Sequence, residues 1–436
     1  MTMRRSIARK GRLSERIGRV KQRLKDERVP SALILSSAPQ RTLSRDQNFA
    51  FRQDSDFFYL TGSQSPGLSL LVSTETQHPF LFVPVTTKHQ ILWEGAPPNY
   101  QELAQEIGAE LIVSKDRLRD LLEKLKGISK LYFQNVPDSL AWKVALHLME
   151  LPSHRRGALP KAFEHSDSIL AEMRLYKDAH EIELITKAAR ITAESIQKAA
   201  PLIRPGISES EVAAALEYGF RSSDGEVAFP TIVAGGKNAA VLHHRAGASR
   251  LEENQMLLID CGATLQGYAA DISRVFPISG VLDQKQAEIY DIVLSASRAA
   301  IRRMKDGVRL RAVQDTAVRV LTEGLKELGV LRGKTSNLIK RDAYKPYFPH
   351  SIGHSLGLDV HDIVPYSHAA KAKSDFILKR GMVFTVEPGL YFAKPVRSIK
   401  PSGYRIEDDV LVTLREPVVL SSESPTAIAE VESLLR

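Results

Sequence analysis

The first third of the chain alternates short apolar runs with amphipathic segments. The apolar runs are bounded by turn-forming residues and have the length of buried strands, whereas residues 101–107 and 116–126 have helical periodicity. The strand-like runs are SALILSS (31–37), LSLLVS (68–73) and FLFVPV (80–85). Prolines and a glycine interrupt the pattern over residues 151–170 and predict a boundary there. Residues 1–171 are therefore predicted to form an α/β domain.

Beyond this boundary the order of the predicted elements changes and then repeats. A helix over 178–199 begins at the capping pair Asp178 and Glu181, and Ser208 with Glu211 starts a second helix. Strand-like segments follow, and the same order recurs with helices near 284–305 and 311–328. The strand-like segments are FPTIVA, QMLLIDCGA and GYAADISRVFPI in the first round and GMVFTVEPG and YRIEDDVLVTL in the second. This recurrence predicts a duplicated α+β unit over residues 172–436.

The net charge of +9 comes almost entirely from the amino-terminal segment. Residues 1–28 contain 11 Lys or Arg against three acidic residues, which leaves about +1 for the rest of the chain and no basic groove for nucleic acid. Leu13, Ile17, Val20 and Leu24 follow helical spacing within the segment. We therefore expect a basic tail (1–12) that leads into the first helix.

Composition also bears on the compartment. The chain has no run of 18 apolar residues and no apolar segment of the signal-peptide type, so no membrane association or secretion is expected. The single cysteine, Cys261, excludes an internal disulfide bond and fits a reducing compartment. These features favour a cytoplasmic protein.

Four acidic residues lie in apolar, strand-like surroundings, which normally exclude charge. Asp260 and Asp271 occupy consecutive strands, and a hairpin centred on Leu265-Gln266 would set them opposite each other on one face. Glu387 and Glu407 repeat the pattern in the second half. Carboxylates this close repel one another unless a cation lies between them, so the set predicts a hard-cation site. Taken singly, each acid could instead pair with an arginine or backbone amides.

Three histidines fall within the 13 residues of HSIGHSLGLDVHD (350–362). They could be ligands of one zinc ion, separate parts of a larger site, or the polar side of a helix. The zinc-protease pattern H-E-x-x-H fails because Ser351 stands in the glutamate position. Gly353 and Gly357 weaken a continuous helix, which makes the helical interpretation the weaker one.

From about residue 172 to the end, these motifs together resemble the pita-bread metallopeptidases, the group of methionine aminopeptidase, prolidase and aminopeptidase P. The group's five metal ligands occur in the order Asp, Asp, His, Glu, Glu. The resemblance assigns them to Asp260, Asp271, His354, Glu387 and Glu407. It implies two divalent ions per chain, assigned as Mn²⁺ because four carboxylates with one imidazole suit this ion better than a thiolate or all-histidine set would.

The resemblance also implies roles for residues around the ligands. His350, His361, His243 and Arg405 would line the substrate site, while His244 is expected at the surface. A hydroxide bridging the two metals would attack the scissile carbonyl, with Glu387 as the proton shuttle. His243 and His361 would donate hydrogen bonds to the developing oxyanion.

The segment FRQDSDFFYLTG (51–62) is similar to the domain that precedes the catalytic unit in aminopeptidase P and prolidase. The histidine and glutamate motifs most resemble aminopeptidase P, although His244 stands where tyrosine is usual and Pro230 also departs from the bacterial pattern. The resemblance implies a homo-oligomer, dimer or tetramer, that removes the first residue from peptides with proline second. The alternatives are a prolidase, which cleaves Xaa-Pro dipeptides, and a metal-free peptide- or protein-binding module of the same fold.

Overall fold

The computed structural model describes residues 2–365 and 376–436 and divides into two compact units, Met1–Met173 and Arg174–Arg436. The division falls inside helix α8 (Asp167–Leu175), two residues beyond the expected boundary. Within the described residues, no helix combines the length and the apolar character needed to cross a bilayer.

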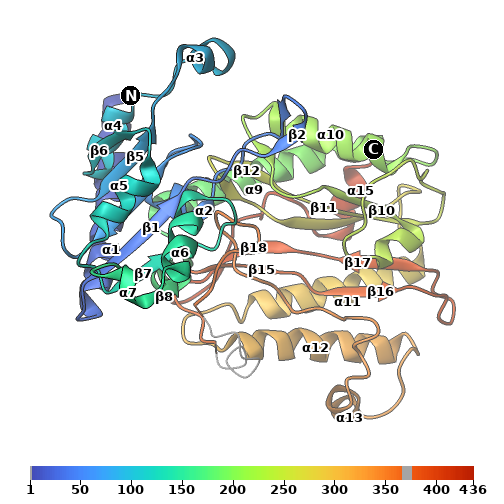
Figure 1. Cartoon of the computed structure of the whole chain (residues 1–436). Coiled ribbons are helices and arrows are strands. Elements are labelled where there is room, and N and C mark those ends of the chain that lie inside the picture. The colour runs from blue at the N-terminus through green and yellow to red at the C-terminus, as the bar shows by residue number, and fades with distance from the viewer. Residues whose placement is uncertain (1, 366–375) are drawn as a thin grey trace. The chain divides into compact units, whose positions relative to one another are not determined.

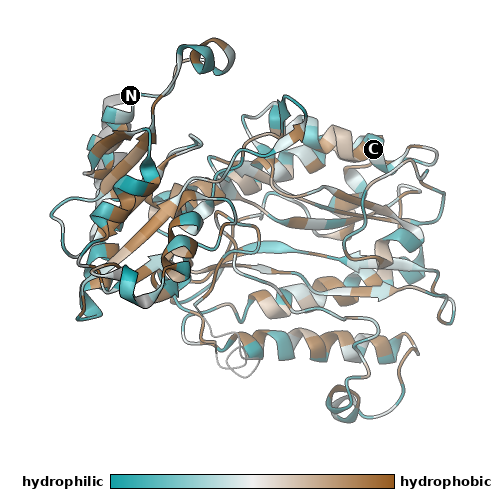
Figure 2. Cartoon of the chain, viewed as in Figure 1, coloured by the Kyte–Doolittle hydropathy of each residue, from teal (hydrophilic) through white to brown (hydrophobic). Residues whose placement is uncertain are grey.

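The first unit is built on a six-stranded mixed sheet in the order β6-β5-β4-β1-β7-β8 (Figure 1). The central strand β1 is buried throughout, pairs antiparallel with β4 and parallel with β7, and is coloured as hydrophobic in Figure 2. The strands are β1 (Ser31–Ser36), β4 (Ser69–Ser73), β5 (Phe80–Pro84), β6 (Glu110–Ser114), β7 (Lys130–Phe133) and β8 (Ala162–His165), with a small hairpin β2 (Thr42–Ser44) and β3 (Gln47–Asn48). The remaining helices are α1 (Thr2–Asp26), α2 (Ser55–Thr61), α3 (Lys88–Glu94), α4 (Tyr100–Ile107), α5 (Arg117–Lys124), α6 (Leu140–Glu150) and α7 (Ser153–Arg156).

One expectation for this unit is wrong. Residues 2–12 do not form a tail ahead of the first helix, because α1 already begins at Thr2. The apolar positions Leu13, Ile17, Val20 and Leu24 are buried, as their helical spacing predicts. The basic residues extend this helix because Lys and Arg are good helix formers.

The second unit repeats a pair of helices followed by a three-stranded sheet, which confirms the predicted α+β duplication. The first half contains α9 and α10 with the sheet β10-β11-β14, and the second contains α11 and α12 with β15-β18-β19. Figure 1 shows the two helix pairs on opposite outer faces of this unit, with the sheets between them. The first-half elements are α9 (Ala179–Ala199), η1 (Ala200–Leu202), α10 (Glu209–Arg221), β9 (Glu226–Val227), β10 (Ile232–Gly235), η2 (Gly236–Ala240), β11 (Met256–Cys261), β12 (Ala263–Leu265), β13 (Tyr268–Ala269) and β14 (Ile272–Pro277). Those of the second half are α11 (Gln284–Ile301), α12 (Leu310–Glu327), α13 (Thr335–Lys340), β15 (Val383–Val386), β16 (Gly389–Phe392), β17 (Ser402–Arg405), β18 (Asp408–Leu411), β19 (Val418–Val419) and α15 (Ile428–Ser433).

Local sequence signals explain where these helices begin. The side chains of Asp178 and Ser208 accept hydrogen bonds from backbone N–H groups of the first helical turn. The side chains of Glu181 and Glu211 in turn accept from the backbone N–H of the capping residue, as predicted. The apolar faces of the helices then pack on the sheets, and residues such as Val212, Leu258 and Val293 belong to one buried cluster. This core holds the strands that carry the acidic residues.

Candidate metal centre

Asp260 and Asp271 lie on one face of the first sheet, but not opposite each other. Asp260 pairs with Ser273 in the antiparallel ladder of β11 and β14, so Asp271 is its diagonal neighbour. The expected hairpin centre was one residue too early: Leu265 pairs with Tyr268, and the loop is Gln266-Gly267. Both loop residues have positive φ, 50° and 86°, as in the tight turns that match strand twist. The shift moves the pairing partner but keeps both carboxylates on the same face.

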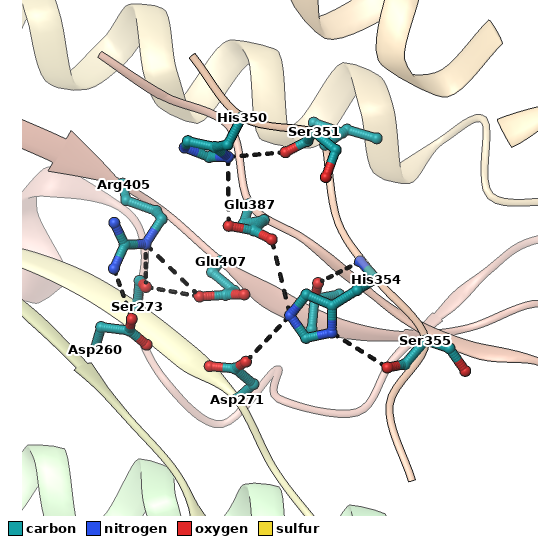
Figure 3. Close-up of polar contacts among 12 residues, drawn as sticks. Asp260, Asp271, Ser273, His350, Ser351, His354, Ser355, Glu387, Arg405 and Glu407 are labelled. Carbon is teal, nitrogen blue, oxygen red and sulfur yellow. Dashed lines mark hydrogen bonds and ion pairs between the residues drawn. The ribbon is translucent and has the colours of Figure 1, made fainter. Parts of the chain in front are cut away.

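Glu387 and Glu407 come from the second half of the unit. Glu387 follows β15, and its backbone N–H donates to the carbonyl oxygen of Ile352 at 2.8 Å. Glu407 lies between β17 and β18, and its N–H donates to the carbonyl of Ser273 at 3.2 Å. The bond to Ser273 ties the second half to the first at the position where the carboxylates meet (Figure 3).

His354 reaches the carboxylates from a non-helical loop, so the helical interpretation of residues 350–362 is excluded. Its backbone N–H donates to the Thr385 hydroxyl at 3.1 Å. The preceding Gly353 is required, because a Cβ there would stand 2.0 Å from the Thr385 carbonyl oxygen. His354 Nε2 lies 3.4 Å from Asp271 Oδ2 and 3.8 Å from Glu387 Oε1. Ligand atoms of Asp271, His354 and Glu407 all lie within 4.8 Å of one another, close enough to share one cation.

The electrostatics of this cluster favour a bound cation. Burial, and then the charge of Glu407, raises the pKa of Asp271 well above its usual value. Burial, and then the charge of Glu387, also raises the pKa of Glu407 well above its usual value. Burial raises the pKa of Glu387 to about 8. Burial also lowers the pKa of His354 to about 4, which keeps the imidazole neutral, as a metal ligand must be. A divalent cation would offset the repulsion among the acids and restore their ionised forms.

Hydrogen bonding leaves oxygen atoms available at the centre of the cluster. Arg405 donates to Asp260 Oδ2 at 2.6 Å and to the Ser273 hydroxyl at 2.8 Å, and Ser273 donates to Glu407 at 2.7 Å. Asp260 Oδ1 and Asp271 Oδ1 are buried without a hydrogen-bond partner among the described residues. Arg405 therefore pairs with one oxygen of Asp260, whereas Asp260 Oδ1 and Asp271 Oδ1 are available as ligands of a hard cation.

The remaining predicted histidines surround the cluster in separate positions. His350 Nε2 lies 2.8 Å from the Tyr391 hydroxyl, and burial lowers the pKa of His350 to about 4. The His361 ring stacks on His354 with centroids 3.8 Å apart. Burial, and then the charge of His243, lowers the pKa of His361. Both histidines are exposed. Their exposure leaves both rings accessible to a ligand.

A buried set of ion pairs anchors the far end of the histidine loop. Asp362, next to His361, accepts from Arg174 at 2.5 Å and from Lys177 at 3.0 Å. The same Lys177 amine lies 3.4 Å from the hydroxyl of Ser355, next to His354. The buried cations therefore fix the residues next to His354 and His361.

Sequence reasoning missed several participants and misplaced one. Tyr391 links His350 to Arg405, whose guanidinium donates to its hydroxyl at 2.9 Å, and the alternation of β16 from Gly389 could have pointed to it. Asp409 accepts the backbone N–H of Asp271 at 3.2 Å. His244 is not at the surface: its side chain is 19% exposed and lies 2.8 Å from Glu209. That bond withdraws the imidazole from solvent.

Comparisons with known proteins agree with this arrangement. Residues 183–414 match metallopeptidase family M24, and residues 9–132 match the aminopeptidase P N-terminal domain. The chain is 33% identical over 418 residues to an Xaa-Pro aminopeptidase of Haemophilus influenzae, covering 93% of each chain. It resembles the structure of aminopeptidase PepP of Pseudomonas aeruginosa with a TM-score of 0.89 and 33% identity, covering 97% of this chain and 98% of the other. Aminopeptidase P of Escherichia coli with the inhibitor Pro-Leu gives a TM-score of 0.89, 31% identity and the same coverage.

Proposed function

The chain belongs to metallopeptidase family M24, and on that premise we propose that it is an aminopeptidase that releases the first residue from peptides with proline in second position. The observation that carries the proposal is the buried cluster of four carboxylates around a neutral imidazole, with two carboxylate oxygens lacking hydrogen-bond partners in the described structure. The names of the similar proteins support the substrate class.

The proposed ligands are Asp260, Asp271, His354, Glu387 and Glu407, and the proposed cofactor is a pair of Mn²⁺ ions. Such a pair, when bound, supplies an activated water for hydrolysis near neutral pH. The donor set is rich in oxygen and contains no thiolate, which favours Mn²⁺ over softer ions. Asp271 and Glu407 both share a close cluster with His354. Together with His354, these two carboxylates would hold the metal.

The chain's own residues would position the peptide and move the proton. Glu387, whose side chain is 17% exposed, would move the proton between the attacking water and the leaving nitrogen. His243 and His361 are both exposed and would donate hydrogen bonds to the substrate carbonyl. His350 and Arg405, joined through Tyr391, would complete the wall of the substrate site.

Proline in second position demands this kind of site. The nitrogen of an Xaa-Pro bond carries no hydrogen, so a peptidase that must bind that N–H discriminates against it. A site that binds the carbonyl through histidines and protonates the leaving nitrogen from Glu387 does not need the missing hydrogen. This requirement supports the Xaa-Pro assignment but is shared by prolidases.

The deciding measurement compares kcat/KM with added Mn²⁺ for Ala-Pro-Ala and for Ala-Pro. We expect the tripeptide to be preferred. A preference for the dipeptide by tenfold or more, about 1.4 kcal/mol of discrimination, would make the chain a prolidase. Metal analysis tests the remaining alternative, because purified protein that binds no Mn²⁺ would be a metal-free binding module.

We further propose a cytoplasmic homo-oligomer, dimer or tetramer. Support for self-association comes from α3, none of whose residues is buried within the chain. Leu92 and Trp93 on this helix are 81% and 74% exposed, and such apolar side chains are typical of contacts between proteins. Sedimentation at micromolar concentration tests this assignment: a monomer there would contradict it.

A further inference from the structure

The residue beside His243 is held by a buried carboxylate that no part of the proposed chemistry uses. Glu209 is the first residue of α10, and its side chain is only 1% exposed. A buried acid of this kind needs hydrogen-bond donors, and the amino end of a helix also favours negative charge. The residues that donate hydrogen bonds to Glu209 show which segment of the chain this carboxylate stabilises.

Three partners of this carboxylate all come from residues 235–244. Glu209 Oε1 accepts from the backbone N–H of Gly235 and from the side-chain amide of Asn238, each at 2.9 Å. Glu209 Oε2 lies 2.8 Å from His244 Nε2. One carboxylate thus joins the beginning, the middle and the end of a single segment.

The same segment carries His243 between two fixed points. The backbone N–H of His244 donates to the Val241 carbonyl at 3.1 Å and closes a turn that contains His243. On the other side, the 3₁₀ helix η2 packs against β17 so closely that a Cβ on Gly403 would stand 2.0 Å from the Ala239 carbonyl oxygen. His243 itself is exposed. The backbone on both sides of His243 is therefore held by hydrogen bonds and close packing.

We propose that His244 and Glu209 form a positioning pair that holds His243 in place to bind the carbonyl of the substrate. His244 touches no substrate in this arrangement; it acts through the backbone of its neighbour. The inference rests on the proposed aminopeptidase function, because the role of His243 belongs to that function.

A double-mutant cycle distinguishes positioning from a general structural role. His244→Phe removes the bond to Glu209, and we expect it to lower kcat/KM for Ala-Pro-Ala about tenfold. His244→Gln retains an N–H that can reach Glu209 and should recover activity to within about threefold of wild type. In a His243→Ala background, His244→Phe should change kcat/KM by less than about twofold, since the side chain to be positioned is gone. His147→Phe, at an exposed position of α6, is the matched control and should leave activity unchanged.

The outcomes separate the two proposals. Equal losses from His244→Phe with and without His243, or no loss with His243 present, would overturn the positioning pair. A second measurement does not depend on turnover: amide hydrogen exchange of residues 235–244 should accelerate at least about tenfold in His244→Phe and stay near wild type in His244→Gln. Unchanged exchange in His244→Phe would also overturn the pair. Failure of the wild-type enzyme to cleave any Xaa-Pro peptide would overturn the proposed function instead, and the exchange result would still decide whether the pair holds this segment.

Discussion

Replacing Glu387 by glutamine should remove a loss of stability that the metal-free protein undergoes between pH 5 and pH 8, and it should destroy the activity of the metal-loaded enzyme. The pKa of the Glu387 carboxyl rises from 4.5 to about 8 because the group is buried. The folded protein therefore retains this proton up to about pH 8, whereas the unfolded chain releases it near pH 4.5. Between these limits the folded state binds more protons, so the free energy of unfolding falls as the pH rises.

The size of the effect follows from the width of that interval. Each pH unit within it costs about 1.4 kcal/mol, so the wild-type protein should lose up to about 4 kcal/mol between pH 5 and pH 8 through this group. The amide introduced by Glu387→Gln cannot ionise, so the variant should lose none of this amount. Comparing the change with pH, and not the absolute stability, cancels any constant cost of burying the amide.

The assay must report on the second unit. Both tryptophans, Trp93 and Trp142, lie in the first unit, so tryptophan fluorescence would follow the wrong part of the chain. Pulsed hydrogen exchange of peptides from β11, β14 and β15 across a urea series, in chelator-treated protein, measures the relevant transition. Glu253→Gln, at an exposed position, is the control and should show the wild-type pH dependence. If Glu387→Gln and wild type changed in parallel, within about 1 kcal/mol from pH 5 to pH 8, burial of this acid could not be the source of the pH dependence.

Two further predictions concern the rest of the site. Alanine in place of Asp271 or Glu407 should lower kcat/KM by more than about 100-fold, which exceeds the effect of losing a partner outside the ligand set. The melting temperature of the metal-free protein should be kept or raised, because a repelling buried acid is gone, and near-normal activity at limiting Mn²⁺ would argue against both ligands. Tyr391→Phe removes the hydroxyl between His350 and Arg405 and should lower kcat/KM about tenfold without changing the Mn²⁺ content. Loss of Mn²⁺ in this variant would mean that the tyrosine supports the metal ligands and not the substrate wall.

The parts of the fold that could be predicted from sequence are those fixed by neighbouring residues. The capping pairs at Asp178 and Ser208 set helix starts within one turn, and a charge such as Asp260 inside an apolar strand stands out locally. The predicted register of the β11–β14 hairpin was wrong by one residue because the local signal at the turn is weak. The turn at Gln266-Gly267 needs two residues with positive φ, and glutamine is a weak signal for this conformation compared with asparagine or aspartate.

The parts that could not be predicted depend on contacts between distant positions. Glu209 in the first turn of a helix has the ordinary pattern of an exposed acid, and only the fold brings His244 to it across 35 residues. The same holds for Tyr391, 41 residues from His350. Hydrogen-bond partners of this kind leave no periodicity in the sequence, so sequence patterns show a side chain's chemical type but not its partner.

The two halves of the second unit contribute equally to the carboxylate cluster, and this has a consequence for biosynthesis. Asp260 and Asp271 are made well before Glu387 and Glu407, which lie near the carboxyl end of the chain. Because synthesis runs from the amino end, the first half emerges from the ribosome with two acids and only half of a cation site. Capture of a metal by the full set of carboxylates must then wait until Glu407 has been made. A chain truncated before Glu387 would consequently lack half of the carboxylates of the site.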